Sequence, residues 1–347
     1  MNMKAAFIKE HGDIGKLIIG ELDVPKIAPN EVLIETKYAA LNHIDLFLIN
    51  GWPGLNLKMP HVLGSDGSGI IKEIGSEVTN FQEGDRVSVN PGTSCGKCHM
   101  CLSGKQVFCK NFSIMGEYDW GTFAQNFKVP EVNVLKLPRS FTLDKAAAAP
   151  LTFLTAYRML KTQASMSQGD IVFIHGAGGG VSSAAIQIAK FLGGKVIATT
   201  SNQEKMKKAK DIGADFVINY KETPNYDKYV YEKLTNKQGV DIVIDSVGKA
   251  TFQTSLRLLR LGGRLITPGS TTGPLTEIDI RHIFWKHLEI KGSSMGNQSE
   301  FREVMNLIFK GYLDPIIDTT FDFNDIVKAE NYLSEGKQFG KVLVKFP

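Results

Sequence analysis

The sequence predicts an α/β fold in which a β-rich region precedes a doubly wound domain built on a parallel sheet. Two observations predict it. Up to about Asn126, short apolar runs such as EVLIETKYAAL and GSGIIKEIG are closed by Gly and Pro, as strands are. After about Leu143, strands and helices alternate, which is the pattern of βαβ units. A chain of 347 residues has room for about two domains.

The elements of the second region follow one another without a linker. The helical stretch LDKAAAAPLTFLTAYRML comes first, and the strand IVFI then runs into a glycine loop and the helix VSSAAIQIAKFLG. The strand KVIATT and the helix NQEKMKKAKDIGA form the next pair, and FVINY, DIVIDSVG and RLITPGS supply further strands. The tail, GKVLVKF, is predicted to be a strand that returns to the first domain.

The composition indicates a globular protein without a nucleic-acid or membrane partner. Hydrophobic residues make up 43% of the chain, and the net charge is only +4, which is small for a nucleic-acid-binding protein. The basic run Lys205–Lys210 is more typical of a solvated helix face. The N-terminal segment lacks the apolar core of a secretory signal, and no run reaches the roughly 18 apolar residues of a membrane helix. We expect a cytoplasmic protein that acts on a small-molecule substrate.

The four cysteines of the chain predict a metal site. Cys95, Cys98, Cys101 and Cys109 lie in CGKCHMCLSGKQVFC with the spacing C-x2-C-x2-C-x7-C. Clustered cysteines in a chain without a secretory signal are typical of metal ligands rather than disulfides. Four thiolates form a closed tetrahedral zinc site that leaves no position for substrate. We expect these four thiols to hold a metal ion; four free or redox-active thiols are the alternative.

The glycine loop predicts a dinucleotide site. IVFIHGAGGGVSSAAIQIAK has the order of strand, tight turn and helix that such sites need. The motif G-x-G-x-x-G is not met in its usual register, where the three positions are Ala177, Gly179 and Ser182. Small residues would still let the backbone approach a pyrophosphate at the helix N-terminus, although an ordinary strand–helix turn is the alternative. We expect cofactor contacts from four residues: Gly178, Gly179, Gly180 and Val181.

The residues that follow KVIATT predict the form of the cofactor. NAD sites usually place Asp or Glu at the end of this strand to accept from the ribose 2′-hydroxyl. Here the strand ends at Thr200 and is followed by Ser201 and Asn202, with Lys205 close behind. An acid is missing and a cation is near, so we expect NADPH, held by Ser201, Asn202 and Lys205. The alternative is that Lys205 is a surface lysine on a lysine-rich helix.

Several motifs together resemble the medium-chain dehydrogenase/reductase superfamily over nearly the full length of the chain. They are GSDGSGIIKEIGSEV, GDRVSVNPG, the cysteine cluster, AAPLTFLTAY, the glycine loop, GAD, DSVG and FGKVLVKF. The resemblance implies a GroES-like β-rich catalytic domain at residues 1–153 and 294–347 and a Rossmann NADP-binding domain at 154–293. In the first domain it implies a zinc lobe at about 91–112, where the four cysteines hold one structural zinc per chain. It also implies a site between the domains, and homodimers or homotetramers that pair Rossmann edge strands near HLEIKGSSMG.

The resemblance also implies that a catalytic zinc is absent. Zinc alcohol dehydrogenases of the superfamily carry a second zinc, and the positions that match its ligands are Asn42, Ser65 and Leu151, while the proton-relay position is Ile44. An amide, a hydroxyl and an alkyl group do not make a zinc site. The chain therefore resembles the quinone and enoyl reductase branches. Those enzymes transfer hydride from NADPH to an enone, enal, quinone or enoyl thioester without catalytic zinc.

Residue roles follow from the matching positions. We expect Asn42 to donate its amide to the substrate carbonyl, and Asp45 and Asp66 to order the loop beneath the nicotinamide, with simple loop capping as their alternative. Phe47 and Trp52 would line an apolar substrate wall, with core packing as the alternative. Further cofactor contacts are expected at matching positions and at strand ends: His43, Thr155, Tyr220, Ser246, Gly248, Gly269, Ser270, Gly340 and Lys341.

Two other functions stay open. An alcohol dehydrogenase or aldehyde reductase could recruit a metal through unusual ligands such as Asp66 with His43 or His61, and the missing ligands argue against it. A non-enzymatic, crystallin-like protein that binds NADPH or RNA is the second alternative, and the modest charge argues against it. The sequence leaves open the substrate, the proton donor, the choice between dimer and tetramer, and the strictness of the preference for NADPH.

Overall fold

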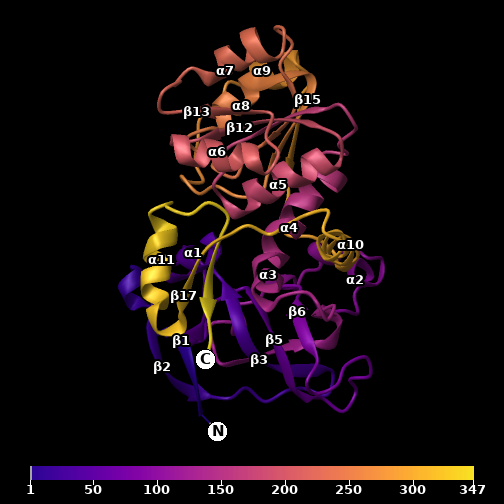
Figure 1. The fold of residues 1–347 in the computed structure, drawn as a ribbon, viewed down its shortest axis with the longest axis vertical. Coiled ribbons are helices and arrows are strands. Elements are labelled where there is room, and N and C mark those ends of the chain that lie inside the picture. Colours follow the sequence, from indigo (N-terminus) through magenta and orange to yellow (C-terminus); the bar gives the residue numbers. More distant parts are fainter. Residues whose placement is uncertain (1) are drawn as a thin grey trace. The chain divides into compact units, whose positions relative to one another are not determined.

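The computed structural model describes residues 2–347 and divides the chain into two compact units, each of which is described by itself (Figure 1). Unit 1 comprises the residues up to Leu151, Gly296–Phe309 and Pro315–Pro347; unit 2 comprises Thr152–Met295 and Lys310–Asp314. These boundaries lie two residues from the ones expected at 153/154 and 293/294. The short segment 310–314 is grouped with unit 2 and not, as expected, with the C-terminal part of the catalytic domain.

Unit 1 is built on two main sheets. The larger has the order β10-β6-β5-β3-β18-β17, with β9 also paired to β3, and the smaller has the order β2-β1-β4. The C-terminal strand β18 pairs antiparallel with β3, so the tail returns to the first domain as the sequence predicts. The strands of these sheets are β1 (Asn2–Ile8), β2 (Ile18–Asp23), β3 (Glu31–Ala40), β4 (His61–Val62), β5 (Asp66–Ile74), β6 (Arg86–Val89), β9 (Asn126–Pro130), β10 (Val134–Lys136), β17 (Ile317–Asp322) and β18 (Lys341–Lys345).

Two helices far apart in the sequence share one core of unit 1. Leu48 and Ile49 of α1 pack in the same apolar cluster as Ile326, Ala329 and Leu333 of α11, together with residues of β1 and β18. In Figure 1, α11 lies beside β17. The helices of unit 1 are α1 (His43–Asn50), α2 (His99–Leu102), α3 (Leu143–Ala148), α10 (Gln298–Phe309) and α11 (Ile326–Ser334). The shared core matters for the site because α1 and α11 also bury acidic side chains.

The cysteine segment has very little regular structure. Between β7 (Gly92–Thr93) and β8 (Ser113–Ile114), which pair with each other, it holds only the four-residue helix α2 and a 3-10 turn at Gln106–Phe108. Such short elements bury little apolar surface, so the segment needs another source of order.

Unit 2 is a doubly wound domain around six parallel strands. Their order, β13-β12-β11-β14-β15-β16, reads 3-2-1-4-5-6 in chain order, which is the Rossmann order. Most of these strands are rich in Val and Ile and buried, as parallel strands covered on both faces are, whereas the edge strand β16 is largely exposed. They are β11 (Ile171–Ile174), β12 (Lys195–Thr200), β13 (Phe216–Asn219), β14 (Val240–Ile244), β15 (Leu259–Thr267) and β16 (Glu289–Gly292).

The helices of the second half complete the alternation. They are α4 (Pro150–Tyr157), which contains the boundary between the units, α5 (Gly180–Phe191), α6 (Gln203–Asp211), α7 (Tyr226–Tyr229), α8 (Phe252–Leu258) and α9 (Arg281–Trp285). Among residues 2–347, no helix combines the length and the apolarity that crossing a bilayer requires.

Candidate active site and metal centre

The N-terminus of α1 is fixed by Asp45. Asn42 is the N-cap of this helix, and its backbone N–H donates to Asp45 Oδ2 at 2.7 Å. The other carboxylate oxygen accepts from the backbone N–H of Gly64 at 3.2 Å. Asp45 is completely buried. It therefore ties the start of α1 to the loop that precedes β5, so loop ordering accounts for both of its oxygens.

Lys341 brings the last strand into the same place. Its ammonium group, which is almost fully buried, donates to Leu41 O at 2.7 Å, to Asn42 Oδ1 at 2.6 Å and to Asp66 Oδ2 at 3.1 Å. These three acceptors account for all three N–H donors of an ammonium. The expected contact of Lys341 with a cofactor would therefore require the loss of one of these bonds.

The amide of Asn42 is also engaged within unit 1. Its Nδ2 donates to Asp66 Oδ2 at 3.0 Å and to Ala40 O at 3.3 Å. Asp66 Oδ1 accepts from the backbone N–H of Leu151 at 2.8 Å. Three positions that the sequence singled out, 42, 66 and 151, thus meet in space. Because both amide hydrogens of Asn42 have acceptors, donation to a substrate carbonyl would first have to displace the longer of these two bonds.

Glu330 is a member of this site that sequence reasoning missed. It lies on α11, it is completely buried, and neither carboxyl oxygen has a hydrogen-bond partner among residues 2–347. Burial and the negative charge of Asp45 raise the pKa of Glu330 well above its usual value, against the opposing effect of Lys341. The signal in the sequence is its spacing: Glu330 falls on the same helix face as Ile326, Ala329 and Leu333, where an apolar residue is expected.

We call Asn42, Asp45, Asp66, Glu330 and Lys341 the Lys341 cluster. It sets three carboxyl groups against one ammonium group in a place without water access. Burial raises the pKa of Asp45 to about 7. Ionised groups are costly to bury without a partner, so the cluster favours binding at least one proton near neutral pH.

The other site residues predicted for unit 1 lie close to members of the cluster in the sequence. Burial and the charge of Lys341 lower the pKa of His43, so at pH 7 it offers a hydrogen bond and no positive charge. Phe47 is 39% exposed and Trp52 is 40% exposed, so core packing does not explain them. Ser65 is buried, and its hydroxyl has no partner in the described chain. Gly340 has φ +98°, and a Cβ there would lie 2.4 Å from Ile316 O, so the turn itself requires glycine.

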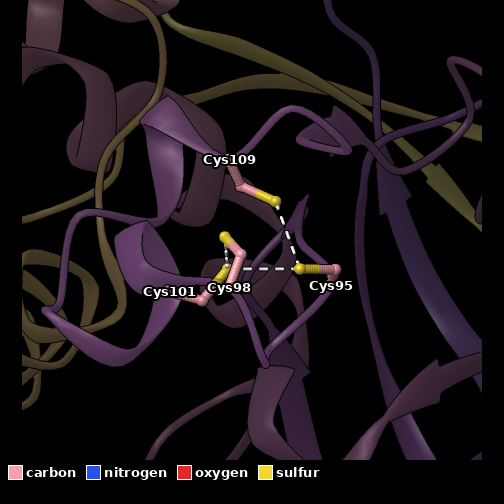
Figure 2. Close-up of side chains that lie close together, drawn as sticks. All are labelled: Cys95, Cys98, Cys101 and Cys109. Carbon is pink, nitrogen blue, oxygen red and sulfur yellow. Dashed lines mark hydrogen bonds between the residues drawn. The ribbon is translucent and has the colours of Figure 1, made fainter.

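The four cysteine sulfurs lie close together (Figure 2). Sγ–Sγ distances are 3.5 Å for Cys109–Cys95, 3.6 Å for Cys98–Cys101 and 3.9 Å for Cys95–Cys101. A tetrahedron with Zn–S bonds of about 2.3 Å has edges of about 3.8 Å, so the four thiols fit zinc. Backbone N–H groups of Lys97 and Cys98 lower the pKa of Cys95 to about 6, which favours the thiolate that binds metal.

The glycine loop of unit 2 has the geometry of a phosphate-binding turn. Gly176 adopts φ +65°, and its N–H donates to Thr199 Oγ1 at 3.2 Å. Gly179 is the N-cap of α5, and no side chain caps this helix, so its first N–H groups have no intrahelical acceptor. Ser182, at the third motif position, donates its hydroxyl to His175 O at 2.8 Å. The loop is therefore anchored to β11 while the helix N-terminus keeps donors for an anion.

Loops at the carboxyl ends of β14 and β15 bring further predicted residues together. Asp245 accepts from the backbone N–H groups of Val247 and Gly248, at 2.9 and 3.0 Å. Gly248 has φ +82°, and a Cβ there would lie 2.8 Å from Ser270, so the two loops touch at this point. The N–H of Thr271 donates to Ser246 O at 3.2 Å. Gly269 belongs to the same pair of loops. Thr155 is buried, and its hydroxyl donates to the sulfur of Met295.

A carboxylate that sequence reasoning missed lies beside the expected 2′-phosphate region. Glu222 accepts from Asn219 Nδ2 at 2.7 Å and from Gln203 Nε2 at 3.2 Å. Gln203 is the first residue of α6, directly after Asn202, whose side chain accepts from the N–H of Lys205. Tyr220 is half-exposed and donates its backbone N–H to Thr200 O at 3.0 Å. A carboxylate thus contacts Gln203, the residue that directly follows Asn202.

Known proteins share both units. The family model of the alcohol dehydrogenase GroES-like domain matches residues 28–139, and that of the zinc-binding dehydrogenase matches residues 180–310. The chain is 30% identical to an NAD-dependent alcohol dehydrogenase of Sulfolobus acidocaldarius, over 99% of both chains. The chain belongs to the medium-chain dehydrogenase/reductase superfamily. The predicted combination of a GroES-like domain and a Rossmann domain is confirmed.

Two further comparisons bear on the activity of this medium-chain dehydrogenase/reductase. It is 30% identical to an acryloyl-coenzyme A reductase of Sulfurisphaera tokodaii, over 94% of this chain and 95% of that protein. A solved structure of an NAD-dependent alcohol dehydrogenase matches with a TM-score of 0.95 and 37% identity, over 99% of both chains. These relatives are oxidoreductases, and this medium-chain dehydrogenase/reductase is an oxidoreductase.

Proposed function

We propose that the protein is an NADPH-dependent reductase that adds hydride to a carbon–carbon double bond conjugated to a carbonyl group. The observation that carries the proposal is the 2.6 Å bond between Lys341 Nζ and Asn42 Oδ1. Position 42 matches a metal ligand of the zinc alcohol dehydrogenases, but here its ligand atom accepts from an ammonium. A cation already stands in the cluster, and the hydroxyl of Ser65 and the alkyl chain of Leu151 are poor zinc ligands.

The chain's own residues supply binding and charge. When bound, NADPH would supply the hydride from its nicotinamide ring. Residues 178–181 at the N-terminus of α5 would bind the pyrophosphate through backbone N–H groups. Addition of hydride to the β carbon moves negative charge to the carbonyl oxygen, and fixed positive charge stabilises it. Lys341 holds such a charge, and Asn42, with its oxygen on Lys341 and its nitrogen on Asp66, keeps the polar groups of the cluster aligned.

The substrate class is proposed from the chemistry and from one relative. The acryloyl-coenzyme A reductase reduces, by its name, an enoyl thioester, which is a conjugated double bond. Enones, enals and quinones share that conjugation. The second candidate is an alcohol dehydrogenase or aldehyde reductase, which the 37% identity to a solved alcohol dehydrogenase favours.

A substrate panel would separate the two candidates. Purified protein is mixed with NADPH and acryloyl-CoA, 2-cyclohexenone, 2-hexenal or a benzoquinone, and with NADP⁺ and ethanol, and the absorbance of reduced cofactor is followed. We expect oxidation of NADPH with at least one conjugated acceptor. The product is heavier by two hydrogens, and it keeps its carbonyl group if the acceptor is the thioester, the enone or the enal, or is a hydroquinone if the acceptor is the benzoquinone. Oxidation of ethanol that is lost on chelation, without reduction of any conjugated substrate, would establish the second candidate instead.

The choice of NADPH can be tested at Glu222. Its negative charge beside α6 opposes a 2′-phosphate, whereas Lys205 attracts one. An exposed charge interaction contributes about 0.2–1 kcal/mol, which is about 1.4- to 5-fold. We expect Glu222→Gln to raise the ratio of kcat/KM for NADPH to that for NADH by this factor, and Lys205→Ala to lower it. Clear preference of the unmodified enzyme for NADH would contradict the cofactor assignment and leave the reaction type standing.

A further inference from the structure

Two polar side chains of unit 2 meet at the point where the order of the Rossmann sheet reverses. β11 and β14 are neighbours in the sheet, although β12 and β13 lie between them in the chain. His175 directly follows β11, and Asp245 directly follows β14. A sheet of this order is built from two mononucleotide-binding halves and binds a dinucleotide across the crevice at this point. His175 and Asp245 therefore lie at the boundary between the two halves of the expected cofactor site.

A serine on α8 joins these two side chains. The Ser255 hydroxyl lies 2.7 Å from Asp245 Oδ2 and 3.1 Å from Thr251 O, and His175 Nε2 lies 2.9 Å from the hydroxyl oxygen. A hydroxyl has one hydrogen, and the carboxylate is the closer and the stronger acceptor, so the hydroxyl donates to Asp245. His175 Nε2 then carries a hydrogen and donates it to Ser255 Oγ. Burial lowers the pKa of His175 against the opposing charge of Asp245, so at pH 7 this is the single N–H of a neutral ring.

The carboxylate of Asp245 holds the loops of the second half. It is completely buried, and Oδ1 accepts from the backbone N–H groups of Val247 and Gly248. Val247 O in turn accepts from the N–H of Thr272 at 2.9 Å and from its hydroxyl at 2.7 Å, which ties the loop after β15 to the loop after β14. Removal of the Ser255 donor would leave a buried charge with one hydrogen bond fewer, which is costly. The positions of both loops therefore depend on Ser255.

His175 belongs equally to the first half. Its carbonyl accepts from the hydroxyl of Ser182, in the first turn of α5, at 2.8 Å. Its ring packs edge-on against Phe173 and Tyr226, with ring centroids 4.9 and 6.0 Å apart. Packing of this kind fixes the direction of the ring and so keeps Nε2 on Ser255. One residue thus contacts the phosphate-binding turn through its backbone and the second half through its side chain.

We propose that His175 and Ser255 are positioning residues that hold the two halves of the cofactor site in register. Both are buried, so they act through Asp245 and its loops and not by contact with the cofactor. A ligand that occupies both halves would depend on this link, whereas a ligand of the first half alone would not. The inference rests on the proposed binding of a nicotinamide cofactor, and it is independent of the substrate and of the choice between NADPH and NADH.

A whole cofactor and half a cofactor together test the proposal on the zinc-loaded, full-length protein. NADPH spans both halves, and 2′,5′-ADP occupies only the first. Ser255→Ala should raise the dissociation constant of NADPH, measured by nucleotide fluorescence, by about 3- to 10-fold, the typical value of one hydrogen bond. The dissociation constant of 2′,5′-ADP, measured by calorimetry, should not change. NADH and ADP form the equivalent pair if the wild type prefers NADH.

Matched variants separate the link from a general loss of stability. His175→Gln keeps an N–H donor and His175→Leu removes it, so the glutamine variant should bind NADPH more tightly than the leucine variant. Thr235→Val is the control, because it removes another buried hydroxyl of unit 2, one that accepts from the N–H of Gly239 at 3.1 Å just before β14. Thr235→Val should leave both dissociation constants unchanged.

Hydrogen exchange gives a readout without cofactor. In Ser255→Ala the amides of Val247 and Gly248 should exchange faster, while those of β12 keep their protection. Equal affinity of NADPH for the wild type and Ser255→Ala, or equal weakening of NADPH and 2′,5′-ADP, would overturn the proposal. A wild type that binds NADPH and shows the expected effect of Ser255→Ala but reduces no substrate would contradict the proposed function alone, because these readouts are binding and exchange.

Discussion

Glu330 carries an ionisable group in a place that cannot solvate its charge. The carboxyl is completely buried on α11. Two charged groups act on it: Asp45 repels an anion there, and Lys341 attracts one. Lys341 already donates to three other acceptors. Glu330 therefore keeps its proton to a higher pH than an exposed glutamate does, and this has a consequence for stability.

The native state binds the Glu330 proton more tightly than the unfolded state, because its folded pKa is raised. This contribution to stability is fully present below the ordinary glutamate pKa and is lost as the pH rises through the raised one. Glu330→Gln keeps the shape and removes the titration. We expect its melting temperature to equal that of the wild type near pH 4 and to exceed it by several degrees near pH 9. Glu73→Gln, at an exposed site of the same unit, is the control, and equal curves for all three proteins would contradict the prediction.

Asn42 links the ammonium of Lys341 to Asp66 through its two side-chain atoms. Asn42→Ala removes both bonds and leaves the cofactor loop of unit 2 untouched. Loss of a group that holds a charge in place typically lowers kcat by about 10²-fold. We therefore expect a large fall in turnover with an unchanged dissociation constant for NADPH, measured by nucleotide fluorescence. Unchanged turnover would remove Asn42 from the mechanism.

At the scale of elements, the cysteine segment is the part of unit 1 with the least support of its own. It contains a pair of two-residue strands and a four-residue helix, and the four thiols lie at distances that suit one zinc ion. We expect elemental analysis to find one zinc per chain. Its removal with a strong chelator should raise hydrogen exchange at residues 92–114 while residues of β11 to β15 keep their protection. Two zinc ions per chain, one of them easily removed together with activity, would contradict the proposal that the active site holds no metal.

Strand β16 forms an open edge of the Rossmann sheet. Ile290 lies on this strand, and Ile280, Phe284 and Trp285 belong to the preceding helix α9 and its N-cap; all four side chains are exposed. An unpaired edge beside apolar side chains is a typical pairing surface. We propose that two copies pair here, and we expect Ile290→Lys to shift the mass measured by light scattering from dimer or tetramer toward monomer. Ile18→Lys, at an exposed isoleucine of unit 1, should leave it unchanged; a monomeric wild type would contradict the proposal.

At the scale of the whole molecule, local patterns predicted the fold well. The alternation of strands and helices and the glycine loop predicted the Rossmann sheet, whose order the structure gives, and the comparisons confirm the GroES-like domain. The cysteine spacing predicted four thiols in one place, because a short segment can bring them together without help from the rest of the fold. The spacing of charges along one helix or loop is likewise visible in the sequence.

Contacts between distant parts of the chain were not predictable in this way. Lys341 bonds to Asn42 across 299 residues, and the pairing of β18 with β3 brings it there. The packing of α11 on α1 brings Glu330 to the same cluster. In the same way, Glu222, which follows β13, bonds to Gln203 at the start of α6 only in the folded chain. The sequence analysis predicted that Lys341 contacts the cofactor, whereas the structure bonds it to Leu41, Asn42 and Asp66. A motif can identify a residue as important, but its hydrogen bonds depend on the folded chain.

The discontinuity of unit 1 also has a consequence for synthesis on the ribosome. β18 lies inside the larger sheet, between β3 and β17, yet it is translated after every other strand of that sheet. β3 therefore lacks its neighbour β18 while the whole of unit 2 is synthesised. Until β18 leaves the exit tunnel, Lys341 does not reach Asn42 and Asp66. A chain that ends before β18 therefore lacks the ammonium group of the Lys341 cluster even when its nucleotide domain is folded.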